Sequence, residues 1–189
     1  MSLQMSSSQT IGPYLHIGTD WLNTSDMAGA GTHGERISIE GRVYDGNGAP
    51  VTDALVELWQ ADADGNYPTP DQPQAVTGFR GFGRVPTDST GHFRFTTIKP
   101  GRVPGPGETM QAPHFAVTIF ARGLLKHLVT RIYFPDGAGN EDDAVLKAVP
   151  AERRATLMAQ PLAQAGAYQF DIVFQGSAGS RPETVFFDV

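Results

Sequence analysis

The sequence feature that most constrains the fold is a long apolar stretch at residues 110–134, interrupted by a turn at residues 122–123. Residues 115–120 are apolar on both faces of an alternating pattern, which is typical of a strand buried between two layers. Residues 127–134 alternate in the same way, with Arg131 among apolar neighbours. The stretch therefore predicts a buried antiparallel hairpin, in which Arg131 needs a partner because an unpaired buried charge is costly.

Shorter segments along the rest of the chain have the alternating pattern of half-buried strands. The turn sequence Asp-Gly-Asn-Gly at residues 45–48 predicts a second hairpin at residues 37–60. Many short strands separated by turns are typical of an all-β protein, here an antiparallel β-sandwich with long loops. The other expected strands cover residues 92–98, 167–174 and 183–189.

Residues 140–160 form the one region with helical signals, a short helical excursion from the sandwich. Asn140 can cap a helix that runs to Ala148, and the acidic residues at its start favour the helix dipole. Pro150 suits the first position of a second helical segment at residues 151–158.

A length of 189 residues is enough for one domain with a sizeable core. We expect that domain at residues 10–189, after a flexible polar tail at residues 1–9. Residues 10–18 are expected to form an extended arm that packs on another surface, because Gly12 and Pro13 oppose a helix there.

Charge and cysteine content exclude several functional classes. Lys and Arg number 14 against 20 Asp and Glu, a net charge of −6, which argues against a general nucleic-acid binder. The absence of Cys excludes disulfides and thiolate metal sites. No signal peptide or membrane-spanning apolar run is visible, so the expected location is the cytoplasm.

Five motifs stand out along the chain: VELWQADADGNY at 56–67, FGRVPTDSTGHF at 82–93, TIKPG at 97–101, APHF at 112–115 and TRIYF at 130–134. Together they resemble the intradiol aromatic-ring dioxygenases, and the resemblance covers nearly the whole chain from about residue 10. In that family, a non-haem ferric iron held by two tyrosines and two histidines activates a catechol for attack by O2.

Two further motifs lie near the ends of the chain, QTIGPYLHIG at 9–18 and ETVFFDV at 183–189. They resemble the alpha subunit of a two-subunit member of this family. The resemblance implies that the assembled enzyme cleaves 3,4-dihydroxybenzoate to 3-carboxy-cis,cis-muconate, a step of the β-ketoadipate pathway. The resemblance implies a higher hetero-oligomer with a homologous beta subunit that holds the Fe3+. Irregular loops at residues 67–83 and 102–107 are expected to contact that partner.

The iron site implied by the resemblance is incomplete in this chain. Tyr67 and His114 match two ligand positions, but Val103 and Ala116 occupy the other two. Valine and alanine side chains have no donor atoms, and an H-x-H pair needs both imidazoles on one face of a strand. We therefore expect no catalytic residue and no metal site in this chain, and we interpret Tyr67 and His114 as residual scaffold residues.

Arg131 and the arm are the candidate substrate-binding residues. A planar guanidinium suits a carboxylate, so Arg131 either pairs with an internal Asp or contacts the carboxylate of 3,4-dihydroxybenzoate. By the resemblance, Thr10, Gly12 and Pro13 either border the partner's pocket or only dock the arm. Two alternatives of other classes stay open: a self-sufficient catechol-type dioxygenase with unusual ligands, and a non-catalytic β-sandwich binding module.

Overall fold

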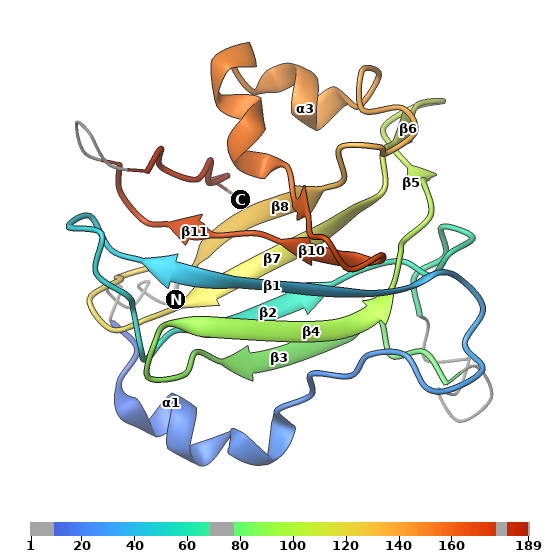
Figure 1. Ribbon diagram of the computed structural model, residues 1–189. Helices are drawn as coiled ribbons and strands as arrows, with labels where there is room; N and C mark the ends of the chain where they lie inside the picture. The colour runs from blue at the N-terminus through green and yellow to red at the C-terminus, as the bar shows by residue number, and fades with distance from the viewer. Residues whose placement is uncertain (1–9, 69–77, 177–180, 189) are drawn as a thin grey trace, which may run out of the picture.

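In the computed structural model, the described residues are 10–68, 78–176 and 181–188, so the tail expected at residues 1–9 and most of the 67–83 loop lie outside them. The described residues form two packed sheets, with helical segments at opposite ends of the molecule (Figure 1). No helix among them is long and apolar enough to cross a bilayer.

Five strands of the described part of the chain form the first sheet: β1 (Arg36–Tyr44), β4 (His92–Ile98), β9 (Gln160–Pro161), β10 (Ala167–Gln169) and β11 (Ile172–Val173). Strand β1 is central and pairs antiparallel with β4. Its pairing with β10 and β11 is parallel, so this sheet is mixed. The expected antiparallel sandwich is confirmed in its main pairings, with this parallel edge as an addition.

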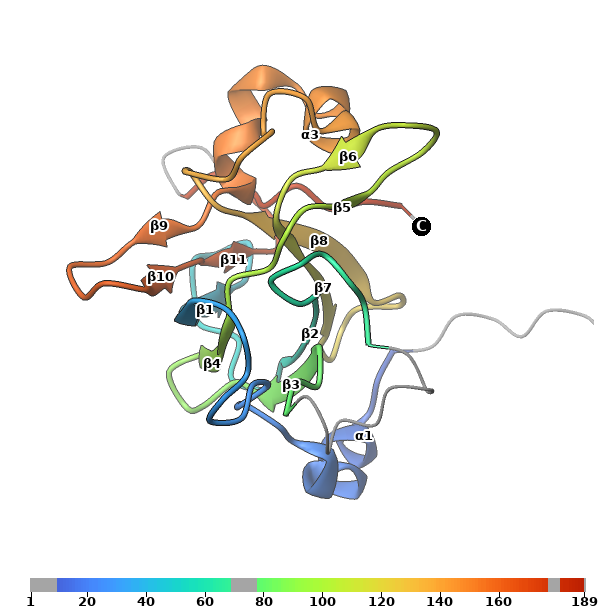
Figure 2. The ribbon, with the colours of Figure 1, turned by 90° about the vertical axis from the view of Figure 1, so that its right-hand side faces the viewer.

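The second sheet has the order β3 (Phe82–Pro86), β2 (Leu55–Trp59), β7 (His114–Phe120), β8 (Leu128–Tyr133), and all of its neighbours are antiparallel. Strands β7 and β8 are the hairpin predicted from the apolar stretch, with Ala116 opposite Arg131. Figure 2 shows this sheet facing the first across the core.

Burial along β7 differs between its two faces. Phe115, Val117 and Ile119 are fully buried in the core, whereas alternate side chains such as Thr118 and Phe120 are only half-buried. The prediction of burial on both faces is therefore correct for the core face and wrong for the other.

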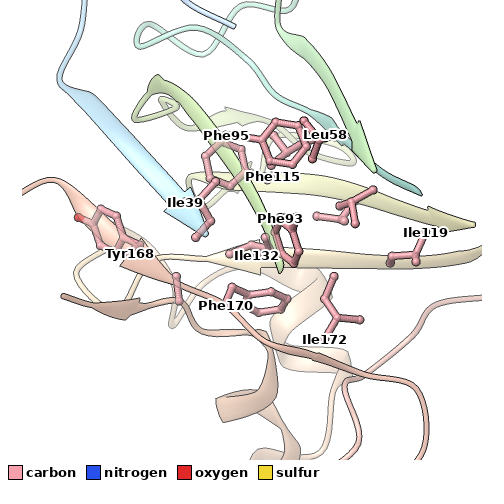
Figure 3. Packing of buried hydrophobic residues seen from close by; sticks show 14 of the residues in the cluster. Ile39, Leu58, Phe93, Phe95, Phe115, Ile119, Ile132, Tyr168, Phe170 and Ile172 are labelled. Carbon is pink, nitrogen blue, oxygen red and sulfur yellow. The ribbon is translucent and has the colours of Figure 1, made fainter. Parts of the chain in front are cut away.

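The core between the sheets is built from aromatic and branched side chains of both layers (Figure 3). Phe93 and Phe95 of β4 lie on one face because they are two residues apart, and both are buried. The ring of Phe115 on β7 packs edge-on against Phe134 at 5.4 Å. Alternation in each strand thus supplies one apolar face, and the two apolar faces meet.

The hairpin predicted at residues 37–60 is wrong, because β1 and β2 belong to different sheets. The turn itself forms, with Asp45 Oδ1 accepting from the backbone N–H groups of Asn47 and Ala49 at 2.9 Å. After it the chain crosses to the second sheet. Strands β1 and β2 each have one apolar face. These faces are buried more fully when the strands lie in two sheets that face each other across the core than when the strands pair edge to edge.

Two C-terminal strand predictions also need correction. The strand expected at residues 167–174 is interrupted between β10 and β11, where the carbonyl of Phe170 lies over Gly41. A Cβ at Gly41 would lie 1.7 Å from that oxygen, so only glycine allows this approach. Residues 183–188 form no regular strand; they run beside β8 with one bridge, from Phe187 to Val129.

The predicted helical region is confirmed as α3 (Ala144–Ala148) and the 3-10 helix η2 (Ala151–Leu157). The cap of α3 is Asp143 and not Asn140, whose side chain donates to the Phe134 carbonyl at 2.7 Å. Pro150 lies one residue before η2, at its N-cap. Asn and Asp are both common N-cap residues, so the sequence alone did not show which of the two precedes the first helical residue.

The extended arm expected at residues 10–18 is partly wrong, because α1 (Pro13–Gly18) is helical and is followed by the 3-10 helix η1 (Asp20–Leu22). Proline fits the first helical position, where its missing N–H is not needed. Beyond η1, bridges from Thr24 to β3 and from Asp26 to β4 close one side of the sandwich. The 102–107 loop includes a short strand, β5 (Val103–Pro104), which pairs with β6 (Met110–Gln111).

Candidate functional site

The second sheet turns a row of side chains away from the core at one end. Phe82, Trp59, Ala116 and Arg131 are successive cross-strand partners on β3, β2, β7 and β8, so their side chains share a face. Tyr67 stacks on Trp59, with ring centroids 6.0 Å apart and an interplanar angle of 5°. The row joins an aromatic surface to a cationic group.

The positions that match iron ligands in the family gather around Arg131. Ala116 is its cross-strand partner, and burial raises the pKa of Tyr67 while the Arg131 charge acts against that rise. His114 is buried, and its ring lies 5.5 Å from that of Tyr133. Val103 is buried on β5 and pairs with Gln111, which contacts Arg131.

These residues do not fit a ferric iron. Val103 and Ala116 offer no donor atom, so two of the four ligand positions cannot bind a metal. Only Tyr67 and His114 remain. Burial raises the pKa of the Tyr67 phenol. Burial and the Arg131 charge lower the pKa of His114 to about 4, and its Nδ1 lies 2.8 Å from the Ala112 carbonyl oxygen. Within residues 10–68, 78–176 and 181–188, no group of three or more His, Cys, Asp or Glu could hold a metal. The iron-free state of this chain stays a prediction.

Arg131 is half-buried, and its hydrogen bonds to the described residues go to neutral side chains. Its Nη1 donates to Gln111 Oε1 at 2.7 Å and to Tyr133 Oη at 3.2 Å. Among the described residues, no carboxylate lies within 4.0 Å of its guanidinium nitrogens. The internal Asp partner that one interpretation of the sequence required is therefore not found in this part of the chain.

Asp143 is the main residue of this region that the sequence interpretation missed. It is fully buried, and Oδ1 accepts from Val145 and Leu146 N–H at 2.9 Å, while Oδ2 accepts from Ala112 N–H at 2.8 Å. The Tyr133 hydroxyl also donates to Oδ1, at 3.2 Å. An aspartate before an apolar helical run is a recognisable N-cap signal, but nothing local indicates its link to Tyr133.

The arm residues lie at the other end of β7. Thr10 Oγ1 accepts from the Gly123 N–H at 2.8 Å, in the turn beyond Phe120. Gly12 borders a cavity of about 370 Å3 with Leu15, Phe120 and Arg122, and Pro13 begins α1. Ala116 and Phe120 are about 13 Å apart along the strand. The structure therefore does not bring Arg131 together with the three arm candidates.

Large apolar side chains are exposed at both ends of this face. Tyr14 and Trp21, on α1 and η1, are 84% and 81% exposed. At the Arg131 end, Trp59, Phe82 and Met110 are each more than a third exposed. Exposed aromatic groups of this size are typical of protein–protein interfaces.

Known proteins resemble this chain over its whole length. A family model described as Dioxygenase matches residues 12–176. The alpha chain of protocatechuate 3,4-dioxygenase from Burkholderia cepacia is 42% identical over 203 residues, which covers 100% of this chain and 99% of that protein. The beta chain from the same organism is 38% identical over 154 residues, covering 76% of this chain and 66% of that protein.

A solved structure resembles the fold as well. It is the dioxygenase domain of a dioxygenase–carbohydrate-binding protein fusion from Streptomyces sp. SirexAA-E, with a TM-score of 0.64 at 27% identity. The match covers 82% of this chain and 89% of that chain. Similarity in sequence and in fold therefore points to the same group of proteins.

Proposed function

The chain belongs to the intradiol ring-cleaving dioxygenase family, and we propose that it acts as the alpha chain of a protocatechuate 3,4-dioxygenase. The complex cleaves 3,4-dihydroxybenzoate by inserting both atoms of O2 between the hydroxyl-bearing carbons, which gives 3-carboxy-cis,cis-muconate. The observation that carries this proposal is full-length similarity to an alpha chain combined with Val103 and Ala116 at two ligand positions.

We propose that the Fe3+ of this non-haem iron family is held by a homologous beta chain. The support is chemical: two of the four positions that match ligands have no donor atom here, and Arg131 places a positive charge beside the remaining two. The catecholate substrate would chelate the iron in the partner, where the metal activates it for attack by O2. This chain would complete the wall of the pocket.

Arg131 is proposed to contact the carboxylate of 3,4-dihydroxybenzoate. Its guanidinium is half-buried and held by neutral acceptors, so its charge stays available to an external anion. For Thr10, Gly12 and Pro13 we propose a place along the partner's pocket, where glycine lets the backbone approach closely. Since the two regions lie at opposite ends of β7, they would make separate contacts. Unchanged kinetics after removal of residues 1–13 would contradict the arm's role.

The partner surface is proposed to include the exposed aromatic groups at both ends of the second sheet. An obligate complex of this kind buries more than about 2,000 Å2 in total. The cytoplasmic location and the single domain at residues 10–189 stay predictions that accompany this assignment.

Expression with and without the beta chain tests the proposal. We expect the isolated chain to carry little iron, to lack a tyrosinate-to-iron absorption band and to be inactive. The co-expressed complex should contain iron and cleave 3,4-dihydroxybenzoate. One iron per molecule in the isolated, active chain would support the self-sufficient dioxygenase. Failure to bind the beta chain would support an independent binding module.

A further inference from the structure

A chain of hydrogen bonds connects Arg131 to a buried carboxylate through one tyrosine. Arg131 Nη1 donates to Tyr133 Oη, and the Tyr133 hydroxyl donates its proton to Asp143 Oδ1, both at 3.2 Å. A phenol has a single proton, and a carboxylate can only accept. The proton therefore lies toward Asp143, and the lone pairs of Tyr133 Oη face Arg131.

Asp143 is fixed in place by backbone donors from two separate segments. Val145 and Leu146 N–H groups at the start of α3 hold Oδ1, and the Ala112 N–H before β7 holds Oδ2. Both segments are covered by apolar packing that includes Leu146 and Tyr133. Burial raises the pKa of Tyr133, so its hydroxyl keeps its proton throughout the working range. The acceptor presented to Arg131 is thus neutral and rigid.

The same nitrogen of Arg131 is held from a second side. Gln111 Oε1 accepts from Nη1 at 2.7 Å, and Gln111 Nε2 donates to the Pro104 carbonyl at 3.0 Å. The two hydrogens of Nη1 therefore each have an acceptor. Within the described part of the chain, Nε and Nη2 have no hydrogen-bond partner. Those two nitrogens form the side edge of the guanidinium, which matches a carboxylate bidentately.

We propose that Tyr133 and Asp143 are positioning residues that orient Arg131, so that its free Nε–Nη2 edge receives the carboxylate of the substrate. This inference rests on the proposed contact between Arg131 and 3,4-dihydroxybenzoate. It assigns to this chain a preference for carboxylated over plain catechols. It also gives a reason for the partners of the buried Asp143, which bonds to Tyr133 and to backbone N–H groups. Asp143 therefore does not compensate the charge of Arg131.

The test compares two substrates in the alpha–beta complex. Tyr133→Phe keeps the packed ring but removes the acceptor for Arg131. We expect kcat/KM for 3,4-dihydroxybenzoate to fall about five- to tenfold, mainly through KM, because the variant loses one ordinary orienting hydrogen bond and keeps the charged contact itself. The loss should be much smaller for catechol, which has no carboxylate. Tyr44→Phe, at a buried tyrosine of the first sheet, is the matched control and should leave both values unchanged.

Arg131→Met separates failure of this inference from failure of the proposed function. If Arg131→Met lowers the preference for the carboxylated substrate and Tyr133→Phe leaves it unchanged, the positioning role is wrong and the contact stands. Equal losses for both substrates in Tyr133→Phe would also overturn it, since they indicate a purely structural role. If Arg131→Met leaves the preference unchanged, two proposals are wrong: the contact of Arg131 with the substrate carboxylate, and the positioning role of Tyr133 and Asp143. Asp143→Asn should shift the preference in the same direction as Tyr133→Phe, and an unshifted preference in a folded Asp143→Asn complex would count against the inference.

Discussion

Two arginines on the same face of the second sheet have opposite surroundings. Arg84 on β3 is buried, and its Nε lies 3.3 Å from the Glu57 carboxylate on β2. Arg131 on β8 is half-buried, and within the described part of the chain its hydrogen bonds go to the neutral side chains of Gln111 and Tyr133. One charge is compensated inside the chain, and the other is held in place without compensation. A buried ion pair serves the fold, whereas an oriented, uncompensated cation suits an external anion.

The largest expected effect comes from breaking the compensated pair. Arg84→Met leaves Glu57 half-buried without its cation, which should lower the free energy of unfolding by about 3 kcal/mol, near the lower end for broken buried pairs. Chemical denaturation of the complex measures it. Any change in kcat/KM should be the same for catechol and for 3,4-dihydroxybenzoate. A selective loss for the carboxylated substrate would show that Arg84, too, acts on substrate.

The pH dependence of stability should report the charge of Arg131. His114 takes up a proton near pH 6.5 when unfolded but only near 4 when folded, because of burial and the nearby Arg131. Between these values the unfolded state binds more protons, so stability falls as the pH falls from 6.5 to 4. The full loss is about 3 kcal/mol.

Two variants check this prediction. His114→Asn does not titrate and should lack this part of the pH dependence, even if it is less stable at neutral pH. Arg131→Met should shift the His114 transition to higher pH, because a repelling charge is removed. Identical pH profiles for the wild type and His114→Asn would mean that His114 is not the titrating group.

Removing the uncompensated charge should affect catalysis more than stability. Arg131→Met loses a charged hydrogen bond to substrate worth about 1.5–3 kcal/mol, which means roughly a ten- to hundredfold fall in kcat/KM for 3,4-dihydroxybenzoate. The free energy of unfolding should change by less than about 1 kcal/mol, because no buried carboxylate loses its partner. Equal kinetic losses with catechol, together with a lowered melting temperature, would instead indicate a structural role.

The sequence predicts the strands around Arg131, but it does not predict the side-chain partners of either arginine. Alternation at residues 115–120 and 127–134 predicts the β7–β8 hairpin because strand faces repeat every two residues. Nothing local indicates that Arg84 meets Glu57, or that Tyr133 meets Asp143, since each pair joins separate segments. Sheet partners were also hidden: β1 and β2 have a correct turn between them but pair with other strands. The iron-site substitutions were visible only through family motifs.

The smallest expected effect comes from giving Arg131 a carboxylate partner like the one that Arg84 has. Gln111→Glu would place a carboxylate where the Gln111 amide oxygen now lies, 2.7 Å from Arg131 Nη1, and so imitate the Arg84–Glu57 pair. A partly exposed ion pair is worth about 0.5–1 kcal/mol, so the preference for 3,4-dihydroxybenzoate over catechol should fall about two- to fivefold. Gln111→Ala, which removes the contact without adding charge, is the matched control and should lower the preference less. If Gln111→Glu bound the carboxylated substrate as well as the wild type, the charge of Arg131 would not be what that substrate meets.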